Sequence, residues 1–491
     1  MKKNKYNILI YLFAFIFIGC EDAIEIDQPG RLDANSAFQT VSDLNLGLLG
    51  LYNEFDTTPE IQFNAVFTDE LAIGFDSGGQ GLGNGEYGFI LNPNSAAPRA
   101  AWENYNDAIN VANRIIAAAE TIEAEGEYNN ILGQTHALRA FAYFQLISYF
   151  SPDYTDDNAL ATILFDFVPT PDLQLPRSTN GEVFALINED LNLADNLLTV
   201  DSNPTFVSKD FITALRARMA AYRGNYAQAA TFASELLSKY PLANKEQYKA
   251  MFLDQDNTEI IFKLERTIND DYDRQGFTGS GFAGGWAGAN FAFVNATIEG
   301  SPYFEIGRSL FNLMNEDDVR YEVNLEPTSI VSPDYTNSAN FKDEDILIVG
   351  KYPGNEKPLL NDLKIFRASE MLLIYAEALV AAGNLEDAAE QIKQLRDARF
   401  GTDQPLPAYA NAQEAFNDIL NERRIELAFE GHRWKDLKRL GTAAGQQIER
   451  DPLDCAVNGA CTLNPTDNRF TMPIPIVELS ANPNIQQNPG Y

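Results

Sequence analysis

Aromatic and polar side chains are concentrated in residues 269–303, a glycine-rich stretch that reads as a loop because glycine disfavours a helix. Trp286 lies within it and carries the largest flat apolar ring surface that a side chain offers. A sugar ring has an apolar face of C–H groups and a rim of hydroxyls, so it can stack on an aromatic ring and hydrogen-bond beside it. The candidate residues for such binding are the rings of Trp286, Tyr272, Phe282, Phe291 and Tyr303, with Asp270, Asp271, Asp273, Arg274 and Asn290 as hydrogen-bonding groups.

A second glycine-rich stretch, residues 68–99, supplies weaker candidates in Asp69 and Tyr87. Two structural alternatives stay open. Asp69 and its neighbour Glu70 could brace the adjacent helix, and Trp286 could plug its own loop against the helices. If Trp286 contacts the ligand, Trp286→Ala loses binding and keeps its thermal stability, whereas a plugging role predicts unfolding instead.

Catalytic patterns are not found in the sequence. Residues 83–88 match G-x-G-x-x-G, but Phe89 and the residues up to Pro93 do not begin a helix that could hold a pyrophosphate. The chain has no G-x-S-x-G elbow, no phosphate-binding loop and no H-E-x-x-H, and it has only two histidines. With 70 acidic residues, pairs of carboxylates are inevitable and do not by themselves indicate a glycosidase. We expect a protein that is not an enzyme and that needs no cofactor or metal.

The first 19 residues have the pattern of an export signal. Basic residues precede an apolar run at residues 8–18, which is too short to span roughly 30 Å of hydrocarbon. The run ends in Phe17-Ile18-Gly19-Cys20, which resembles a bacterial lipobox, so we expect Cys20 to be lipidated and to anchor the chain. An ordinary secretory signal is the alternative, but it prefers a small residue three positions before the cut.

Cys455 and Cys461 are the two other cysteines, and they are separated by the short segment AVNGA. In an oxidising compartment this pair predicts a small disulfide loop. A zinc site is the alternative, but His136 and His432 lie far away in the sequence and no second cysteine pair exists.

Alanine-rich helical patterns interrupted by tight turns run through the rest of the chain. Residues 211–239 and 370–396 each read as two helices joined at a glycine, Gly224 in the first and Gly383 in the second. Residues 102–125 and 129–150 form a third candidate pair. These units resemble tetratricopeptide hairpins, which stack to bury faces that one hairpin leaves exposed. We therefore expect an all-α fold with long irregular loops and minor β structure.

Three segments carry a family resemblance: residues 367–379 (RASEMLLIYAEAL), 422–439 (ERRIELAFEGHRWKDLKR) and 473–491 (PIPIVELSANPNIQQNPGY). Together they resemble the SusD/RagB family of Bacteroidetes. The resemblance implies a signal peptide at residues 1–19, then one SusD-like domain over residues 20–491 with four tetratricopeptide-like hairpins. It also implies a monomeric outer-membrane lipoprotein that faces the cell surface and delivers glycans to a SusC-like TonB-dependent transporter. The RagB branch implies the alternative of a peptide-binding uptake lipoprotein.

Charged residues in these motifs have apolar neighbours at helical spacing, so we expect them to form ion pairs between helices rather than a site. They are Glu370, Glu377, Arg423, Arg424, Glu426, Arg433 and Asp436. Trp102 and Trp434 lie in similar surroundings and are expected in the core.

The acidic composition limits the partners. The 491 residues include 36 basic and 70 acidic side chains, a net charge of −34, which repels nucleic acid. Removal of residues 1–19 takes away three lysines and no acid, so the charge becomes −37. We expect a neutral glycan as the ligand, unless Arg274 and nearby bases form a local positive pocket.

Overall fold

The computed structural model describes residues 37–170, 172–268, 286–294, 297–332 and 345–491. Helices dominate these residues, which confirms the all-α prediction. Among them, no helix combines the length and the apolar character needed to cross a membrane.

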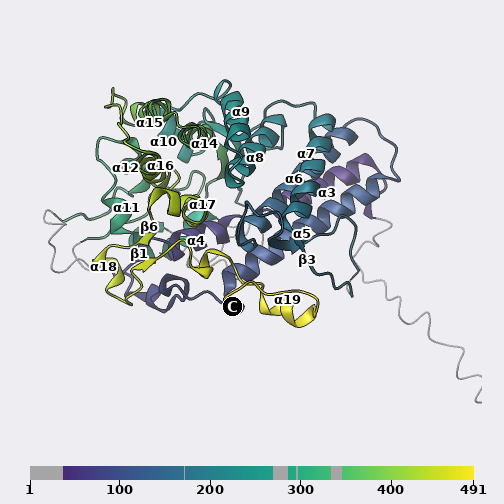
Figure 1. Ribbon diagram of the computed structural model, residues 1–491, viewed down its shortest axis with the longest axis horizontal. Coiled ribbons are helices and arrows are strands. Elements are labelled where there is room, and N and C mark those ends of the chain that lie inside the picture. Colours follow the sequence, from purple (N-terminus) through teal and green to yellow (C-terminus); the bar gives the residue numbers. More distant parts are fainter. Residues whose placement is uncertain (1–36, 171, 269–285, 295–296, 333–344) are drawn as a thin grey trace, which may run out of the picture.

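Consecutive helices pack as antiparallel pairs and form the body of the molecule (Figure 1). The pairs are α5 (Ala96–Ala119) with α6 (Tyr128–Phe150), α8 (Lys209–Tyr222) with α9 (Tyr226–Leu237), α14 (Ala368–Ala381) with α15 (Leu385–Phe400), and α16 (Ala412–Glu426) with α17 (Arg433–Ala444). The three predicted hairpins are all present, although α5 begins six residues before Trp102.

Local sequence explains where several helices start and stop. The turns between α8 and α9 and between α14 and α15 contain Gly224 and Gly383 at φ +69° and +83°, a region that favours glycine. α3 (Val41–Asn53) and α7 (Asn180–Leu197) begin with capping boxes, in which Thr40 and Thr179 accept hydrogen bonds from backbone N–H groups. The glycine turns and the capping boxes each depend on residues that lie close together in the sequence.

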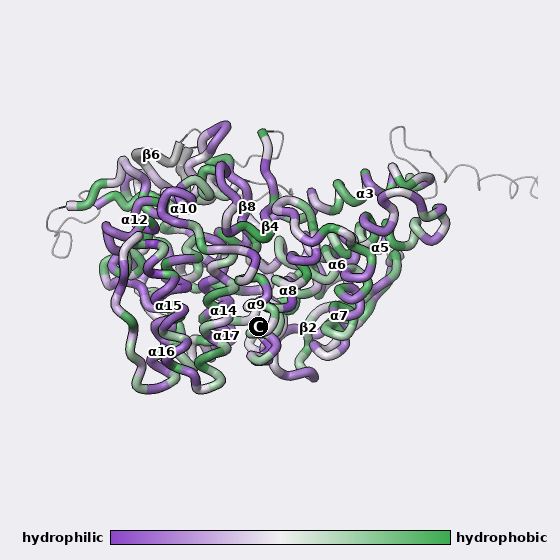
Figure 2. Tube along the Cα trace, turned by 90° about the horizontal axis from the view of Figure 1, so that it is seen from above, coloured by the Kyte–Doolittle hydropathy of each residue, from purple (hydrophilic) through white to green (hydrophobic). Residues whose placement is uncertain are grey.

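The pairs are arranged along the longest dimension of the molecule. Figure 1 shows α14 to α17 at one end and α3, α5, α6 and α7 at the other, with α8 and α9 between them. Figure 2 shows hydrophobic and hydrophilic stretches alternating along these helices. The remaining helices are α4 (Thr58–Phe67), α10 (Lys245–Phe252), α11 (Arg308–Phe311), α12 (Val319–Asn324), α18 (Pro452–Cys455) and α19 (Ile476–Ala481).

Short antiparallel strand pairs join segments that are distant in sequence. They are β1 (Leu71–Ile73) with β7 (Phe304–Ile306), β2 (Leu160–Ile163) with β3 (Arg177–Thr179), β4 (Ile260–Leu264) with β8 (Leu363–Arg367), β5 (Ala292–Val294) with β6 (Thr297–Pro302), and β9 (Ile448–Glu449) with β10 (Thr462–Leu463). Of these, the pair β1–β7 matters most for the site described below.

Buried ion pairs connect the helices, as the motif residues predicted. Arg218 holds Glu370, and Arg439 holds Glu377, each with a nitrogen to oxygen distance of 2.6 Å. Arg423 pairs with Asp436 at 2.8 Å. Glu426 lies between Arg367 and Arg399, whose charges hold the pKa of its carboxyl well below its usual range although burial alone would raise it.

The two motif tryptophans are in the core, which confirms their predicted role. Trp434 is fully buried and stacks between Tyr149 and Phe470 at centroid distances of 5.7 and 5.8 Å. Trp102 is 3% exposed and meets Phe150 edge to face. Each indole is therefore a packing element that fixes helices against each other.

Candidate functional site

The described end of the second glycine-rich stretch, Pro302 and Tyr303, lies beside the first stretch in the structure. β1 continues into one and β7 follows the other, with Leu71 opposite Ile306. Beyond the strands, the N–H of Gly74 donates to the carbonyl of Tyr303 at 3.1 Å. A Cβ at Gly74 would lie 2.0 Å from the carbonyl oxygen of Pro302, so only glycine permits this approach. We call residues 74–90 together with Pro302 and Tyr303 the two-loop surface.

Both apolar and polar side chains face solvent on the two-loop surface. Tyr303 is partly exposed and packs edge to face on Phe304, with ring centroids 4.5 Å apart. Leu82 and Ile90 are 48% and 57% exposed. Gln80 is exposed on the same loop. This combination suits a ligand with apolar faces and hydroxyl edges.

Buried carboxyl groups support the surface from beneath. The carboxylate of Glu305 accepts hydrogen bonds from the N–H groups of Phe75 and Leu347, both at 3.3 Å. Burial raises the pKa of Glu305 to about 7. Asp454 accepts two hydrogen bonds from Arg308 at 2.7 Å, and burial raises its pKa to about 6. Both groups therefore change charge near neutral pH.

Trp286 does not present a free ring face in the structure. It is 6% exposed and belongs to an apolar cluster with Ile346, Ile348, Leu359 and Leu360. The prediction of Trp286 as an exposed platform is therefore corrected to the structural alternative, a plug that holds its loop against the body. The physical reason is that residues 346–360 supply an apolar site that the local sequence around Trp286 does not reveal.

Two other predicted contact residues are also buried. Phe291 is 2% exposed and stacks on Tyr352 with centroids 6.2 Å apart. Tyr87 is 1% exposed, its hydroxyl donates to the carbonyl of Asp454 at 3.0 Å, and the guanidinium of Arg450 lies 4.0 Å from its ring centre. Both rings hold the loops in place and offer no open face to a ligand.

Arg450 is itself a central anchor for this region. Besides covering Tyr87, its guanidinium donates to the carbonyl oxygens of Val66 and Thr68, both at 2.9 Å. These carbonyls lie at the end of α4, where the helix leaves its last acceptors without backbone donors. One side chain thus closes the helix and positions the start of the first loop.

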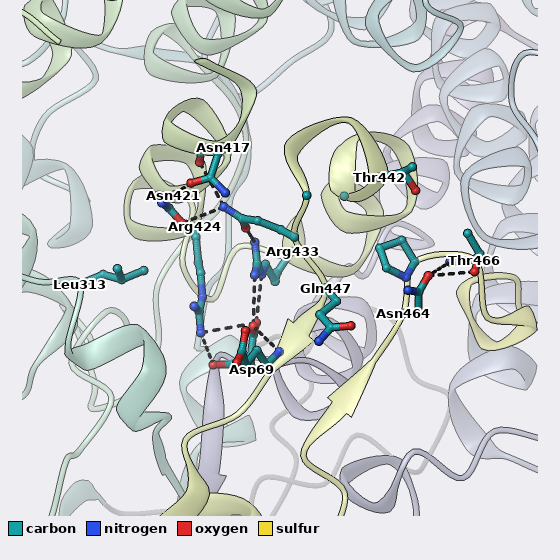
Figure 3. A pocket seen from close by; sticks show the side chains of 15 residues that line it. Asp69, Leu313, Asn417, Asn421, Arg424, Arg433, Thr442, Gln447, Asn464 and Thr466 are labelled. Atoms are coloured by element: carbon teal, nitrogen blue, oxygen red, sulfur yellow. Dashed lines mark hydrogen bonds and ion pairs between the residues drawn. The ribbon is translucent and has the colours of Figure 1, made fainter. Parts of the chain in front are cut away.

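Asp69 is an ion-pair centre and braces the fold (Figure 3). Nε and Nη2 of Arg433 donate to its two carboxylate oxygens at 2.9 and 3.1 Å. Arg424 donates from Nη2 to the backbone oxygen of Asp69 at 2.6 Å. The two guanidinium groups hold the pKa of Asp69 well below its usual range, while burial raises that of Glu70 to about 8. This is the bracing alternative, and direct ligand contact by Asp69 is corrected accordingly.

The remaining predicted contact residues have a different status. Tyr272, Phe282, Asp270, Asp271, Asp273 and Arg274 lie outside the described residues, as does Cys20. Asn290 ends the short 3-10 helix η5 (Ala287–Asn290) directly after Trp286. The structure therefore brings Tyr303 to the two-loop surface and leaves the contacts of residues 269–285 as a prediction.

Cys455 and Cys461 form a disulfide with Cα atoms 5.0 Å apart, the pairing that the sequence favoured over zinc. Asn458, within the closed loop, donates to the carbonyl of Tyr87 at 3.4 Å. The disulfide loop therefore lies against the first glycine-rich stretch and supports it.

Comparison with known proteins matches two parts of the chain to family models. Residues 258–491 match the SusD family, and residues 76–222 match a family described as starch-binding associating with outer membrane. SusD-like protein P38 of Formosa agariphila is 26% identical over 546 aligned positions, which cover 100% of both chains.

Solved structures share the fold. A SusD superfamily protein from Bacteroides thetaiotaomicron superimposes with a TM-score of 0.74 at 23% identity, covering 92% of this chain and 100% of that one. A laminarin binding SusD-like protein superimposes with a TM-score of 0.66 at 22% identity, covering 92% and 100%. The similarity thus extends over nearly all of the described helices and loops.

Proposed function

Because the chain belongs to the SusD family, we propose that it binds a glycan at the cell surface. It is a binding protein and not an enzyme. The observation that carries the proposal is the β1–β7 pair, which brings Tyr303 from a distant part of the sequence beside the first glycine-rich loop, where Leu82 and Ile90 face solvent. A ligand that spans both loops would be held by contacts that neither loop makes alone.

Tyr303 is the described ring that we propose stacks on the ligand. Tyr272 and Phe282 are proposed as further platforms, with Asp270, Asp271, Asp273, Arg274 and Asn290 as hydrogen-bonding partners of the hydroxyls. We propose a neutral glycan, because the net charge of −34 opposes the approach of a polyanion to an exposed surface.

The proposed location and partner rest on the match to the SusD family and on the pattern of the first 20 residues. We propose that lipidated Cys20 anchors the chain to the outer membrane and that the body faces the cell exterior. A SusC-like TonB-dependent transporter is the proposed partner that receives the glycan. Copurification of such a barrel protein with the chain from native membranes tests this partnership.

Calorimetry of the chain without residues 1–20 tests the proposed function. Laminarin and starch serve as glycan probes, and a mixture of peptides tests the alternative ligand class. We expect a glycan to bind with an affinity that changes little between low and high salt, as a neutral ligand requires. A response to peptides alone would refute the proposal.

The affinity of the Tyr303→Ala variant tests whether the glycan binds at the two-loop surface. Loss of one stacking ring is worth about 1 kcal/mol, so we expect the affinity to fall about fivefold. Tyr375→Ala is the matched control, because Tyr375 is also a partly exposed tyrosine but lies on α14. Equal effects of the two substitutions would place the ligand elsewhere.

A further inference from the structure

A cavity of about 660 Å³ lies among α16, α17 and the strand pair β9–β10, at the base of the Asp69 ion pairs (Figure 3). Arg424 and Arg433 line one side, and Thr442, Gln447 and Asn464 line the other. This volume is within the range of small-molecule sites in proteins. None of the predicted glycan contacts except Asp69 lines it.

The buried charges beside the cavity do not cancel. Arg424 and Arg433 are 8% and 3% exposed, and among the described residues Asp69 is the charged carboxylate that pairs with both. Glu70 is mostly uncharged at neutral pH, because burial raises its pKa to about 8. One positive charge is therefore left over in a protein whose overall charge is strongly negative.

Glu449 is the acidic group at the edge of the cavity. Its side chain is exposed, so water and salt weaken its attraction to the guanidinium groups. Its main-chain N–H donates to Asp69 at 3.1 Å, which helps hold the carboxylate between the two arginines. The excess positive charge thus lies deeper in the cavity than the acid that opposes it.

Arg424 has hydrogen-bonding capacity that the described residues do not use. Its Nη2 donates to Asp69 and to the hydroxyl of Ser309, but its buried Nε has no acceptor. Arg433, in contrast, is fixed by Asp69 and by Gln446, to which Nη1 donates at 3.2 Å. A buried guanidinium that lacks a full set of acceptors is costly, and a bound anion would offset that cost.

We propose that this cavity binds an oxyanion group, a carboxylate or sulfate, with Arg424 as its main charged partner and Gln447 and Asn464 lining the remaining space. The proposal does not depend on glycan binding at the two-loop surface. Two sources of the group are compatible with the chemistry: an acidic sugar, for which the cavity is large enough, and a free inorganic oxyanion.

Calorimetry on the purified full-length chain in detergent tests the site with sodium sulfate, sodium glucuronate and glucose, at constant ionic strength. We expect saturable binding of the two anions and at least tenfold weaker binding of glucose. Tighter binding of glucuronate than of sulfate identifies an acidic sugar as the source, and the reverse order identifies an inorganic oxyanion. Failure of both anions to bind, or binding of glucose as tight as that of glucuronate, overturns the proposal.

Variants at the edge of the cavity test its position without removing the buried arginines. Thr442→Trp fills the cavity from an exposed position and should weaken anion binding at least tenfold. Ala443→Trp is the matched control, since Ala443 is the next exposed residue of α17 and does not line the cavity. Glu449→Gln should tighten binding about threefold, because it removes the opposing charge. Unchanged binding in Thr442→Trp would also overturn the proposal.

Discussion

Trp286 could contact the ligand or pack its loop against the body, and the two roles predict opposite effects of Trp286→Ala on stability. Its ring lies in the apolar cluster with Ile346, Ile348, Leu359 and Leu360 and is 6% exposed. We expect Trp286→Ala to lower the free energy of unfolding by about 3 to 5 kcal/mol, because it leaves a large cavity. Chemical denaturation measures this change. A variant with wild-type stability and no glycan binding would restore the contact role.

Glu305 makes stability depend on pH. Its folded-state pKa is raised to about 7 by burial, so between about pH 5 and pH 7 the unfolded chain has largely released this proton while the folded protein still largely holds it. Stability should therefore fall as pH rises. We expect the wild type to lose about 2 kcal/mol more than Glu305→Gln over this interval. Denaturation curves at pH 5 and pH 8 check the difference, and parallel pH profiles would contradict it.

The role of a residue could be predicted where the helical pattern already implied that it faces a neighbouring helix. Glu370, Glu377 and Asp436 were expected in ion pairs, and the structure pairs them. The burial of Tyr87 was not predictable, because its hydroxyl partner at Asp454 is 367 positions away. The cavity beside Arg424 had no local signal either, since its unbalanced charge arises only when α16 meets Asp69.

At the scale of elements, the β1–β7 pair depends on the close approach at Gly74. Because a Cβ there would lie 2.0 Å from the carbonyl of Pro302, we expect Gly74→Ala to separate the two loops and weaken glycan binding at least fivefold. Calorimetry with the glycan that binds the wild type measures the loss.

Gly83→Ala is the control for that substitution. Gly83 lies in the same glycine-rich stretch, but a Cβ there would meet no atom within 4 Å. Its affinity should stay within twofold of the wild type. If Gly83→Ala weakened binding as much as Gly74→Ala, glycine flexibility rather than the strand pair would explain the effect.

Helices were the most predictable elements, and strands the least. The α8–α9 and α14–α15 hairpins followed from alanine spacing and from the turns at Gly224 and Gly383, which are signals within one segment. β1 and β7 have three residues each and pair across 231 to 235 positions, so no periodicity in either strand indicates its partner.

For the whole molecule, the proposed anchor predicts where the protein is found. Cys20→Ala should prevent lipidation and move the chain from the membrane fraction to the soluble fraction, because no other acyl group would hold it. Fractionation of cells that express each form checks this. Membrane retention of the variant that persists after a high-salt wash would contradict the lipid anchor.

The position of Arg450 has a consequence for the order in which the chain folds. Its guanidinium donates to the carbonyls of Val66 and Thr68, so these acceptors at the end of α4 lack this partner until a residue 384 and 382 positions later has been synthesised. Glu478 likewise accepts the indole N–H of Trp102, and Asn488 accepts from Arg177. Such high contact order slows folding. We therefore expect the C-terminal residues to complete the fold last, because these N-terminal groups lack their partners until the end of the chain has been made.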